Sequence, residues 1–251
     1  MRLAIGIEYD GSNYNGWQRQ RVGSGVQEVV EKAASEVADE PVEITCAGRT
    51  DTGVHASGQV GHFDTRADRT ERGWLLGINS ALPDDVSIRW VKPVDDDFHA
   101  RFSALNRSYR YRILNRLVRS ALHRQRCWWF HADLDADAMH AAGQQLLGEH
   151  DFSAFRAAGC QSKSATRELQ YLSVTRQDDW VTLEVRANAF LQHMVRNITG
   201  TLVSIGSGQN EVSWAREVLD SRDRKQGGIT APPQGLTLTQ VAYPGQFQVP
   251  D

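Results

Sequence analysis

Residues 46–59 read CAGRTDTGVHASGQ and place one carboxylate, Asp51, between two glycines, with Arg49 and His55 close by. Glycines permit backbone conformations that would hold Asp51 out of the neighbouring strands. A carboxylate presented in this way can act as a nucleophile or as an electrostatic partner of a developing cation. An Asp beside a glycine can equally cap a turn. The residue types alone therefore leave catalysis and turn capping open.

Asp51-Thr52-Gly53 is also the nucleophile-loop tripeptide of aspartic proteases. Those enzymes hold two carboxylates that share one proton. The chain contains no second Asp-Thr/Ser-Gly tripeptide, and its 251 residues with several expected helices do not fit a short β-rich subunit that would dimerise. The protease interpretation is therefore disfavoured.

A metal or cofactor site is not predicted either. Two histidines and two carboxylates lie close together in this part of the chain: Asp51, His55, His62 and Asp64. Their spacing matches no H-E-x-x-H or comparable ligand set. A Gly-x-x-x-x-Gly-Lys phosphate loop and a complete G-x-G-x-x-G are also missing from the sequence. We expect chemistry that needs neither a cofactor nor a metal.

The composition is that of an ordinary globular protein, with 40% apolar and 24% charged residues, enough for one large domain or two small ones. The cysteines Cys46, Cys127 and Cys160 are odd in number and scattered, which indicates a reducing compartment and no disulfide framework. No apolar run approaches the length of a membrane span. The sequence therefore predicts a cytoplasmic protein that is not in the membrane.

Positive charge is concentrated in one stretch of the chain, although the net charge is −3. Residues 98–132 contain no Asp or Glu. Eight arginines lie there: Arg101, Arg107, Arg110, Arg112, Arg116, Arg119, Arg124 and Arg126. A second acid-free run covers residues 152–167. Such a stripe is typical of a surface that follows phosphates, but it can also be a solvated face paired to nearby acids.

The elements that must position Asp51 follow from the periodicity of apolar residues. In the first part we predict strands at 3–9, 42–46, 58–64 and 86–94, and helices at about 26–37 and 69–82. Ser24 and Gln27 predict a capping box at the first helix, after a long loop at 11–25. The order of the first part is then β-α-β-β-α-β.

The second part repeats this order with one extra helix. We predict strands at 109–113, 169–176, 180–190 and 235–243, and helices at 135–147, 192–205 and 213–221. The fold class is therefore α+β, with two ferredoxin-like (split β-α-β) halves, 1–98 and 99–251. We expect the halves to share a mostly antiparallel sheet with helices packed behind it, and to enclose an active-site cleft.

Several longer motifs carry a resemblance. CAGRTDTGVHASGQVGHF, together with IEYDGSNYNGWQRQ, FHARFSALNRSYRYRILN, ANAFLQHMVRNITGTL and APPQGLTL, closely resembles the tRNA pseudouridine synthase A family, from about Leu3 to Tyr243. The resemblance implies a cofactor-independent homodimer that isomerises uridines 38, 39 and 40 in the anticodon arm of tRNA. The family usually has Ala after the catalytic Asp, where this chain has Thr52; Thr is small enough to fit.

The resemblance also implies roles for individual residues. Asp51 is the catalytic carboxylate. Arg196, in HMVRNI, is its partner, and a guanidinium there would keep Asp51 ionised in a closed pocket where burial alone would raise its pKa. Tyr109, in RSYRYRI, stacks against the target base and assists proton transfer at C5, whereas Tyr111 is expected in the core.

The remaining candidates concern the RNA. Arg49 is similar to the residue that enters the stack when the target uridine is extruded. His55 could touch the substrate backbone or form a hydrogen bond within its loop. The candidates for phosphate contacts are Arg107, Arg110, Arg112, Arg156 and Lys163. Alternation along the strand places Arg110 and Arg112 opposite Tyr109.

A non-catalytic RNA-binding protein of the same fold is the alternative from another functional class. A carboxylate facing a polyanion would weaken the binding of RNA. The presence of Asp51, Tyr109 and Arg196 therefore favours an enzyme.

Overall fold

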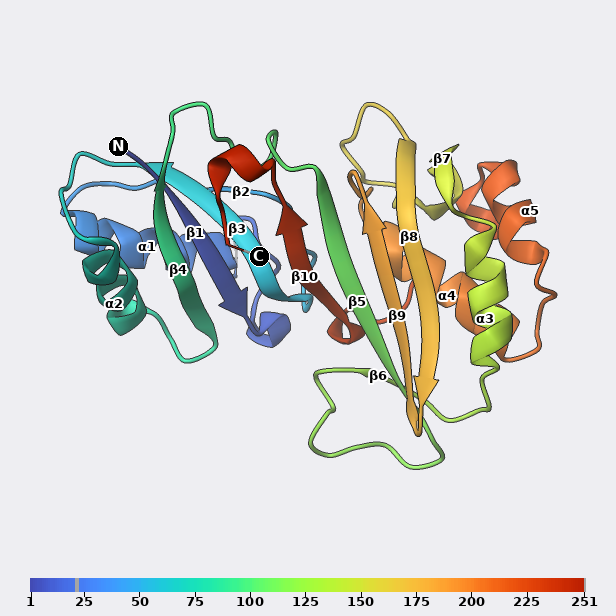
Figure 1. Cartoon of the computed structure of the whole chain (residues 1–251). Helices are drawn as coiled ribbons and strands as arrows, with labels where there is room; N and C mark the ends of the chain where they lie inside the picture. Colours follow the sequence, from blue (N-terminus) through green and yellow to red (C-terminus); the bar gives the residue numbers. More distant parts are fainter. Residues whose placement is uncertain (21–22, 251) are drawn as a thin grey trace. The chain divides into compact units, whose positions relative to one another are not determined.

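A computed structural model describes residues 1–20 and 23–250 and divides the chain into two compact units (Figure 1). Unit 1 contains Met1–Arg107 and Leu238–Asp251, and unit 2 contains Ser108–Thr237. Both units combine strands with helices, and the strand pairs whose register is known are antiparallel except for one, so the predicted α+β class is confirmed.

The units differ from the predicted halves, which met after Phe98. The segment that follows Phe98 stays with unit 1, because the end of the chain returns to it. The hydroxyl of Tyr243 donates a hydrogen bond to the carbonyl of Ala100 at 2.6 Å, and the amide of Leu105 donates to the carbonyl of Ala242 at 2.8 Å. Contacts between residues so distant in sequence carry no local signal, so the prediction could not include them.

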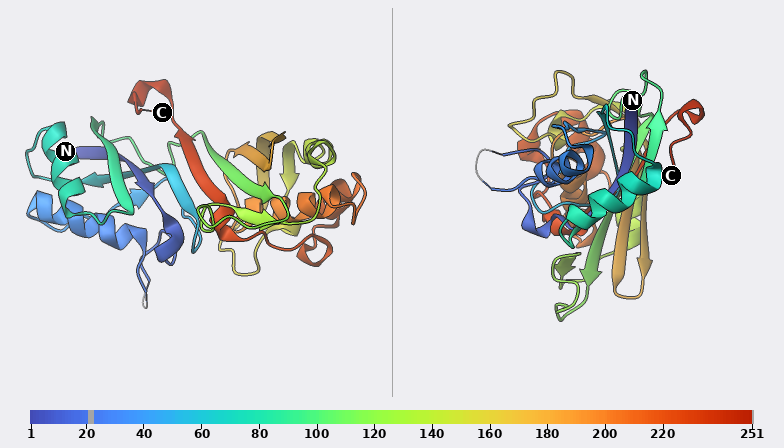
Figure 2. Two further views of the ribbon diagram at one scale, coloured as in Figure 1. Left: turned by 90° about the horizontal axis from the view of Figure 1, so that it is seen from below. Right: turned by 90° about the vertical axis from the view of Figure 1, so that its left-hand side faces the viewer.

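Unit 1 has the predicted order β-α-β-β-α-β and gains one further strand, β10 (Leu236–Ala242), which was predicted for the second half. In chain order its elements are β1 (Arg2–Tyr9), α1 (Val26–Ala38), β2 (Thr45–Cys46), β3 (His55–Asp64), α2 (Glu71–Ala81), β4 (Val86–Val94) and, at the end of the chain, β10. The strand order is β4-β1-β3-β10, with β2 beside β3, and β1 is antiparallel to β3 and β4. Figure 2 shows α1 and α2 on one face of this sheet.

Strand β1 is buried on both faces, although its pattern predicted a half-buried strand. Leu3, Ile5 and Ile7 are almost fully buried on one face. On the other face, a Cβ atom added to Gly6 would lie only 2.2 Å from the indole nitrogen of Trp90. The small residues of β1 therefore make room for a large side chain of β4 rather than facing water.

The predicted capping box at the start of α1 is wrong. The N-cap is Gly25, which makes no side-chain capping bond. The amide of Gln27 instead donates to the Glu31 carboxylate at 2.9 Å and to the carbonyl of Ile44 at 3.2 Å. Glu31 also accepts the amide hydrogen of Ile44 at 2.9 Å, so this N–H is not available to a neighbouring strand. For this reason the strand expected at 42–46 shrinks to β2.

His62 on β3 gives unit 1 a dependence on pH. Its Nδ1 accepts a hydrogen bond from the amide of Ala100 at 3.1 Å. Burial, together with the nearby charges of His99 and Arg2, lowers the pKa of His62 to about 4. Because the folded state favours neutral His62, its stabilising contribution is complete above the ordinary pKa of about 6.5 and is lost as the pH falls towards 4.

We expect the free energy of unfolding to fall between pH 6.5 and pH 4, with on the order of 2 kcal/mol of the loss due to His62. In His62→Gln, whose amide can accept the same bond but does not titrate, this part of the loss should disappear. Urea unfolding at several pH values measures both curves. Parallel curves for the two proteins would contradict the assignment.

Unit 2 follows the predicted order as far as its last helix, with two short strands that the pattern missed; the closing strand predicted at 235–243 is β10, most of which belongs to unit 1. Its elements are β5 (Asn106–Asn115), β6 (Trp128–Phe130), α3 (Ala136–Gln144), β7 (Gly148–Asp151), β8 (Thr166–Gln177), β9 (Trp180–Ala187), α4 (Met194–Gly206) and α5 (Trp214–Ser221). The strand order is β5-β9-β8-β7, and β6 pairs with β5 in parallel. Strands β6 and β7 are three and four residues long, too short to show a period.

Helix α4 is buried on nearly all sides, because the segment around Ile229 covers the face that would otherwise be exposed to solvent. Gly200 is the point of closest approach. A Cβ atom there would lie 1.7 Å from the carbonyl oxygen of Ile229. The buried amide of Asn197 donates to the carbonyl of Phe155 at 2.7 Å, and its oxygen accepts from the hydroxyl of Thr230 at 2.7 Å. The segment around Ile229 therefore fixes α4 and its first turn.

Candidate active site

The Asp51 loop joins β2 to β3 in unit 1 and is held at the residue before the carboxylate. The carbonyl of Thr50 accepts a hydrogen bond from the amide of Trp17 at 3.1 Å. The hydroxyls of Thr50 and Tyr9 lie 2.8 Å apart in the interior. After Asp51 the chain turns, with the amide of Val54 donating to the Asp51 carbonyl at 3.1 Å. The motif IEYDGSNYNGWQRQ thus fixes the backbone before Asp51, and the turn to Val54 fixes the backbone after it.

Gly16 lies directly against the backbone of this loop at Thr50 and Asp51. It has a φ of +91°, and a Cβ atom there would lie 2.5 Å from the Thr50 carbonyl oxygen and 3.0 Å from the Asp51 carbonyl carbon. Only glycine fits both the conformation and the space. The sequence predicts a loop in this region but does not indicate that Gly16 supports Asp51; the glycine next to Trp17 was the available signal.

We expect Gly16→Ala to lower kcat for the reaction at Asp51 about tenfold or more, because the loop backbone must move away from the new methyl group. Gly208→Ala is the matched control, since Gly208 has a φ of +74° and nothing within 4 Å of an added Cβ. The control should lose about 1–2 kcal/mol of stability with kcat unchanged. Equal kcat values for the two variants would show that the contact with Thr50 is unimportant.

The side chains of the loop differ in exposure. Asp51 is half-buried, whereas Arg49 and Thr52 are exposed. An exposed side chain at position 52 needs no space in the core, which is consistent with the expected tolerance of Thr there. Arg49 extends into solvent two residues before Asp51, a position from which a guanidinium can reach a large ligand.

His55, at the start of β3, is buried, with 3% of its surface exposed. Its Nδ1 lies 3.1 Å from the amide nitrogen of Gly11 and 3.0 Å from a carboxylate oxygen of Asp10. His55 thus ties β3 to the turn after β1, whereas the hydrogen bond considered for it was one within its own loop. Contact with the substrate backbone stays a prediction.

Unit 2 contributes the second group of candidates, which starts on β5. Tyr109 is buried, and its ring meets the ring of Phe190 edge-on at a centroid distance of 5.1 Å. Tyr111 is in the core, as predicted, and its hydroxyl donates to the carbonyl of Pro232 at 2.7 Å. Arg110 is exposed and pairs with Glu184 at 2.8 Å. The predicted alternation of tyrosines and arginines on β5 is confirmed.

Arg196 lies in the first turn of α4, next to the segment that covers this helix. Its Nε donates to the carbonyl of Ala231 at 2.8 Å, and the amide of Ala231 donates back to the carbonyl of Arg196 at 3.1 Å. Burial raises the pKa of Tyr111, and the charge of Arg196 partly opposes this shift, so the two side chains are near each other. Unit 2 thus brings Arg196 and the tyrosine strand together around Pro232.

The candidates for phosphate contacts differ in how many hydrogen bonds their side chains already form within the protein. Arg107, in unit 1, is buried and donates to the carbonyls of Ala47 at 2.9 Å and Arg101 at 2.7 Å. Arg156 donates to the carbonyls of Cys160 and Ser162 at 2.6 and 2.7 Å. These bonds give both arginines a structural role, and their phosphate contacts stay predictions.

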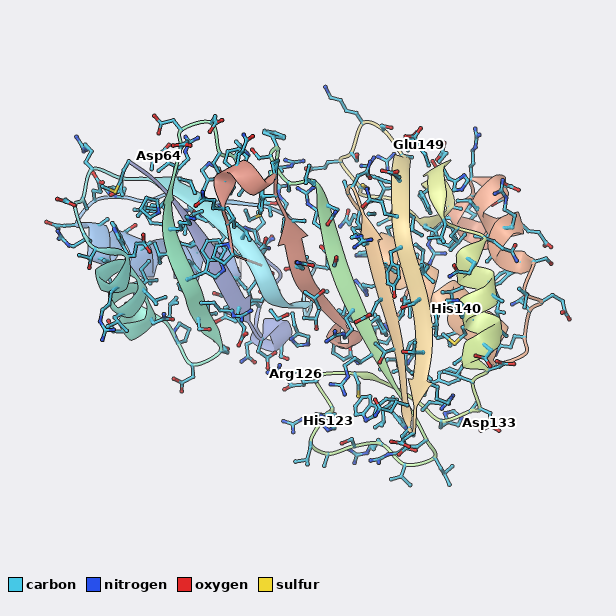
Figure 3. The ribbon with its side chains drawn as sticks, viewed as in Figure 1. Asp64, His123, Arg126, Asp133, His140 and Glu149 are labelled. Carbon is cyan, nitrogen blue, oxygen red and sulfur yellow. The ribbon has the colours of Figure 1, made fainter. Side chains whose placement is uncertain are left out.

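The other candidates are more accessible. Arg112 lies over the ring of Trp180, with its guanidinium carbon 3.9 Å from the ring centroid, and Lys163 is exposed. The segment between β5 and β6 carries further exposed arginines: Arg116, Arg119, Arg124 and Arg126. Figure 3 labels His123 and Arg126 in this segment. Most arginines of the acid-free stretch are therefore exposed to solvent, whereas Arg107 is buried and bonds to main-chain carbonyls of unit 1.

The structure groups the sequence-predicted residues by unit. Unit 1 holds Asp51, Arg49, His55 and Arg107, and unit 2 holds Tyr109, Arg196, Arg110, Arg156 and Lys163. Across residues 1–20 and 23–250, no group of three or more His, Cys, Asp or Glu side chains is arranged to hold a metal ion. In the same described part of the chain, every helix is too short or too polar to cross a membrane.

Comparison with known proteins gives a consistent result over almost the whole chain. A family model described as tRNA pseudouridine synthase matches residues 5–103 and 142–244. A tRNA pseudouridine synthase A of Aeromonas hydrophila is 56% identical over 250 residues, covering 100% of this chain and 93% of that protein. A protein of the same name from Hydrogenovibrio crunogenus is 54% identical over 248 residues, covering 99% and 95%. The matched ranges contain both the Asp51 loop and Arg196, and the chain belongs to the tRNA pseudouridine synthase family.

Proposed function

We propose that this enzyme isomerises uridines 38, 39 and 40 in the anticodon arm of tRNA, with Asp51 as the essential carboxylate. As a tRNA pseudouridine synthase, the chain converts uridine to pseudouridine in tRNA. The positions within the tRNA and the roles of the individual residues are the proposed part. The observation that supports the role of Asp51 most directly is its place on a loop whose backbone is fixed on both sides, inside the matched range.

The reaction requires little besides positioning and charge. The N1–C1′ glycosidic bond breaks, the uracil turns, and a C5–C1′ bond forms; C5 then loses its proton and N1 gains one, so that the product is an isomer. Cleavage puts positive charge on the sugar. A carboxylate at Asp51 can attack C1′, stabilise this charge or take a proton from C2′.

The other candidates support this step. We assign Arg196 to keep Asp51 ionised near the polyanionic substrate, because a guanidinium favours the charged form of a carboxylate. Tyr109 stacks on the uracil and assists the loss of the C5 proton. Arg49 fills the space left in the RNA when the uridine is extruded, since a flat cation can stack and bind phosphate at once.

Phosphate contacts are assigned to the exposed cations of unit 2 before the buried Arg107. Arg110 is exposed beside Glu184, and Lys163 is exposed in the second acid-free run. The enzyme is further proposed to act as a cytoplasmic homodimer, in keeping with the resemblance to its family.

The test uses unmodified tRNA transcripts in which a single uridine remains at position 38, 39 or 40. Carbodiimide-stop primer extension maps pseudouridine after incubation with the enzyme. The proposal expects product at each of the three positions, and none in a transcript whose uridines all lie outside the anticodon arm. Product outside the arm would overturn the proposed specificity, and RNA binding without any product would favour the non-catalytic alternative.

A further inference from the structure

Three rings in unit 1 contact one another in a row that ends at the protein surface. The ring centroids of His62 and His99 are 4.8 Å apart with 58° between the ring planes, and those of His99 and Phe102 are 4.3 Å apart with 33° between the planes. His62 is buried, whereas Phe102 is 76% exposed. The rings therefore form a column from the interior outwards, with Phe102 at its outer end.

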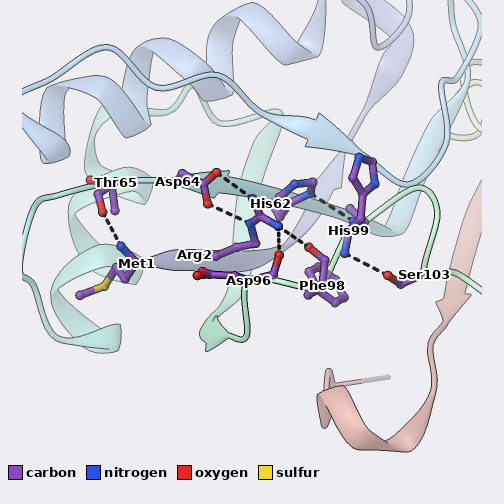
Figure 4. Close-up of polar contacts among 10 residues, drawn as sticks. Met1, Arg2, His62, Asp64, Thr65, Asp96, Phe98, His99 and Ser103 are labelled. Carbon is purple, nitrogen blue, oxygen red and sulfur yellow. Dashed lines mark hydrogen bonds and ion pairs between the residues drawn. The ribbon is translucent and has the colours of Figure 1, made fainter.

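The turn that carries this column is held rigidly. The Nδ1 of His99 accepts hydrogen bonds from the amides of Arg101 and Phe102, both at 3.2 Å. The amide of His99 donates to the hydroxyl of Ser103 at 3.0 Å, a bond drawn in Figure 4, where His62 and His99 are also labelled. The backbone that carries Phe102 is thus fixed, and a ligand that uses the ring need not order the turn first.

The positively charged Arg101 lies next to the exposed Phe102 ring. The Arg101 guanidinium carbon lies 5.6 Å from the centroid of the Phe102 ring. Arg101 is exposed, and within the described parts of the chain no carboxylate forms an ion pair with it. The turn also opens the acid-free stretch that begins at Phe98. A flat apolar ring beside a cation is suited to the two chemical parts of a nucleotide. The base can stack on the ring, and the anionic phosphate can bind the cation.

We propose that Phe102 and Arg101 form a stacking platform for an unpaired base of the tRNA anticodon loop, in addition to the residues that handle the target uridine. This inference rests on the proposed RNA substrate. Base stacking requires a planar ring at position 102, whereas an apolar protein partner would bind any side chain of similar size there. Replacing the ring therefore distinguishes a base from a protein partner. Leu105, which is 54% exposed in the same segment, would be covered by a protein partner but is not needed by a base.

The test measures the Kd of an anticodon-arm RNA by fluorescence anisotropy for Phe102→Ala, Phe102→Leu and Phe102→Trp, with Leu105→Ala as control. Because Phe102 is exposed, these changes should leave the fold intact. We expect both variants without a ring to raise the Kd about tenfold, and Phe102→Trp to bind at least as tightly as wild type. Leu105→Ala should stay within about twofold, and kcat at saturating RNA should be unchanged in all four variants.

A matching change in the RNA identifies the base. Abasic substitutions are made one at a time through the unpaired loop. At one position the abasic RNA should bind the wild-type protein about tenfold more weakly than the intact RNA does. The Phe102→Ala variant should bind both RNAs equally, because this variant has already lost the stacking contact. The proposal would be overturned if no position showed this coupling, or if Phe102→Leu bound like wild type.

Two other outcomes have separate meanings. If Phe102→Ala and Leu105→Ala both shift the mass measured by analytical ultracentrifugation, a second copy of the chain covers the turn and the stacking proposal is wrong. Failure of the wild type to form pseudouridine would instead remove the proposed function, while the Kd values would still decide whether Phe102 binds a base.

Discussion

The substitution Asp51→Asn is expected to lower pseudouridine formation by about four orders of magnitude while leaving the Kd for tRNA within a few-fold of wild type. Asn keeps the size of the side chain but carries no negative charge, so it cannot attack C1′, take a proton from C2′ or stabilise a cationic sugar. Binding should persist because the removed charge repels the RNA backbone. Release of the C5 proton from tritium-labelled uridine measures the rate under single-turnover conditions.

Thr52→Ala is the matched control for this experiment. It changes the exposed neighbour in the same loop to the residue that the family usually has, and we expect a rate within about twofold of wild type. A slow Thr52→Ala would mean that loop geometry, and not the charge of Asp51, accounts for the loss in Asp51→Asn. A fully active Asp51→Asn would show that another residue is the essential group.

The second large effect concerns Arg196. We expect Arg196→Lys to lower kcat about 10²–10³-fold with little change in the Kd for tRNA. Lys keeps the positive charge but loses the planar fork, and it has no Nε group to hold the carbonyl of Ala231, so its charge would be placed differently. Single-turnover rates and Kd values separate this loss from a loss of binding.

Arg110→Lys provides the comparison for Arg196→Lys, because Arg110 is exposed and its partner Glu184 lies on the surface. The same change there should leave kcat unaltered and alter the Kd at most a few-fold. If Asp51 and Arg196 act as one unit, the double variant Asp51→Asn/Arg196→Lys should be no slower than Asp51→Asn alone. Fully additive losses would show that the two residues act in separate steps.

The sequence by itself determined the order and type of the long elements. Apolar periodicity predicted the strand at 86–94 with the bounds that β4 has, and it predicted α2 and α4 to within two residues at each end. These elements follow local patterns, because each one repeats its apolar positions over at least two turns or four alternations. The motifs around Asp51 and Arg196 likewise needed only the order of residues to indicate the family.

The tertiary structure decided what depends on contacts between distant residues. The strand expected from Val42 is short because the amide of Ile44 bonds to Glu31 on α1. The predicted Ser24 cap is replaced because Gln27 reaches Glu31 and Ile44 instead. In both cases a bond with Ile44, 13 or 17 positions away from its partner, overrides a local preference, and a bond between such distant residues leaves no mark in the neighbouring sequence.

The same distinction applies to the charged residues. The sequence presents Arg107, Arg110 and Arg101 as equivalent members of one acid-free stretch. In the fold, Arg107 is buried against main-chain carbonyls, Arg110 pairs with Glu184, and Arg101 stands exposed beside the Phe102 ring. An exposed arginine is more available to an RNA than a buried one, because a buried guanidinium that already donates to carbonyls must give up those bonds to bind phosphate.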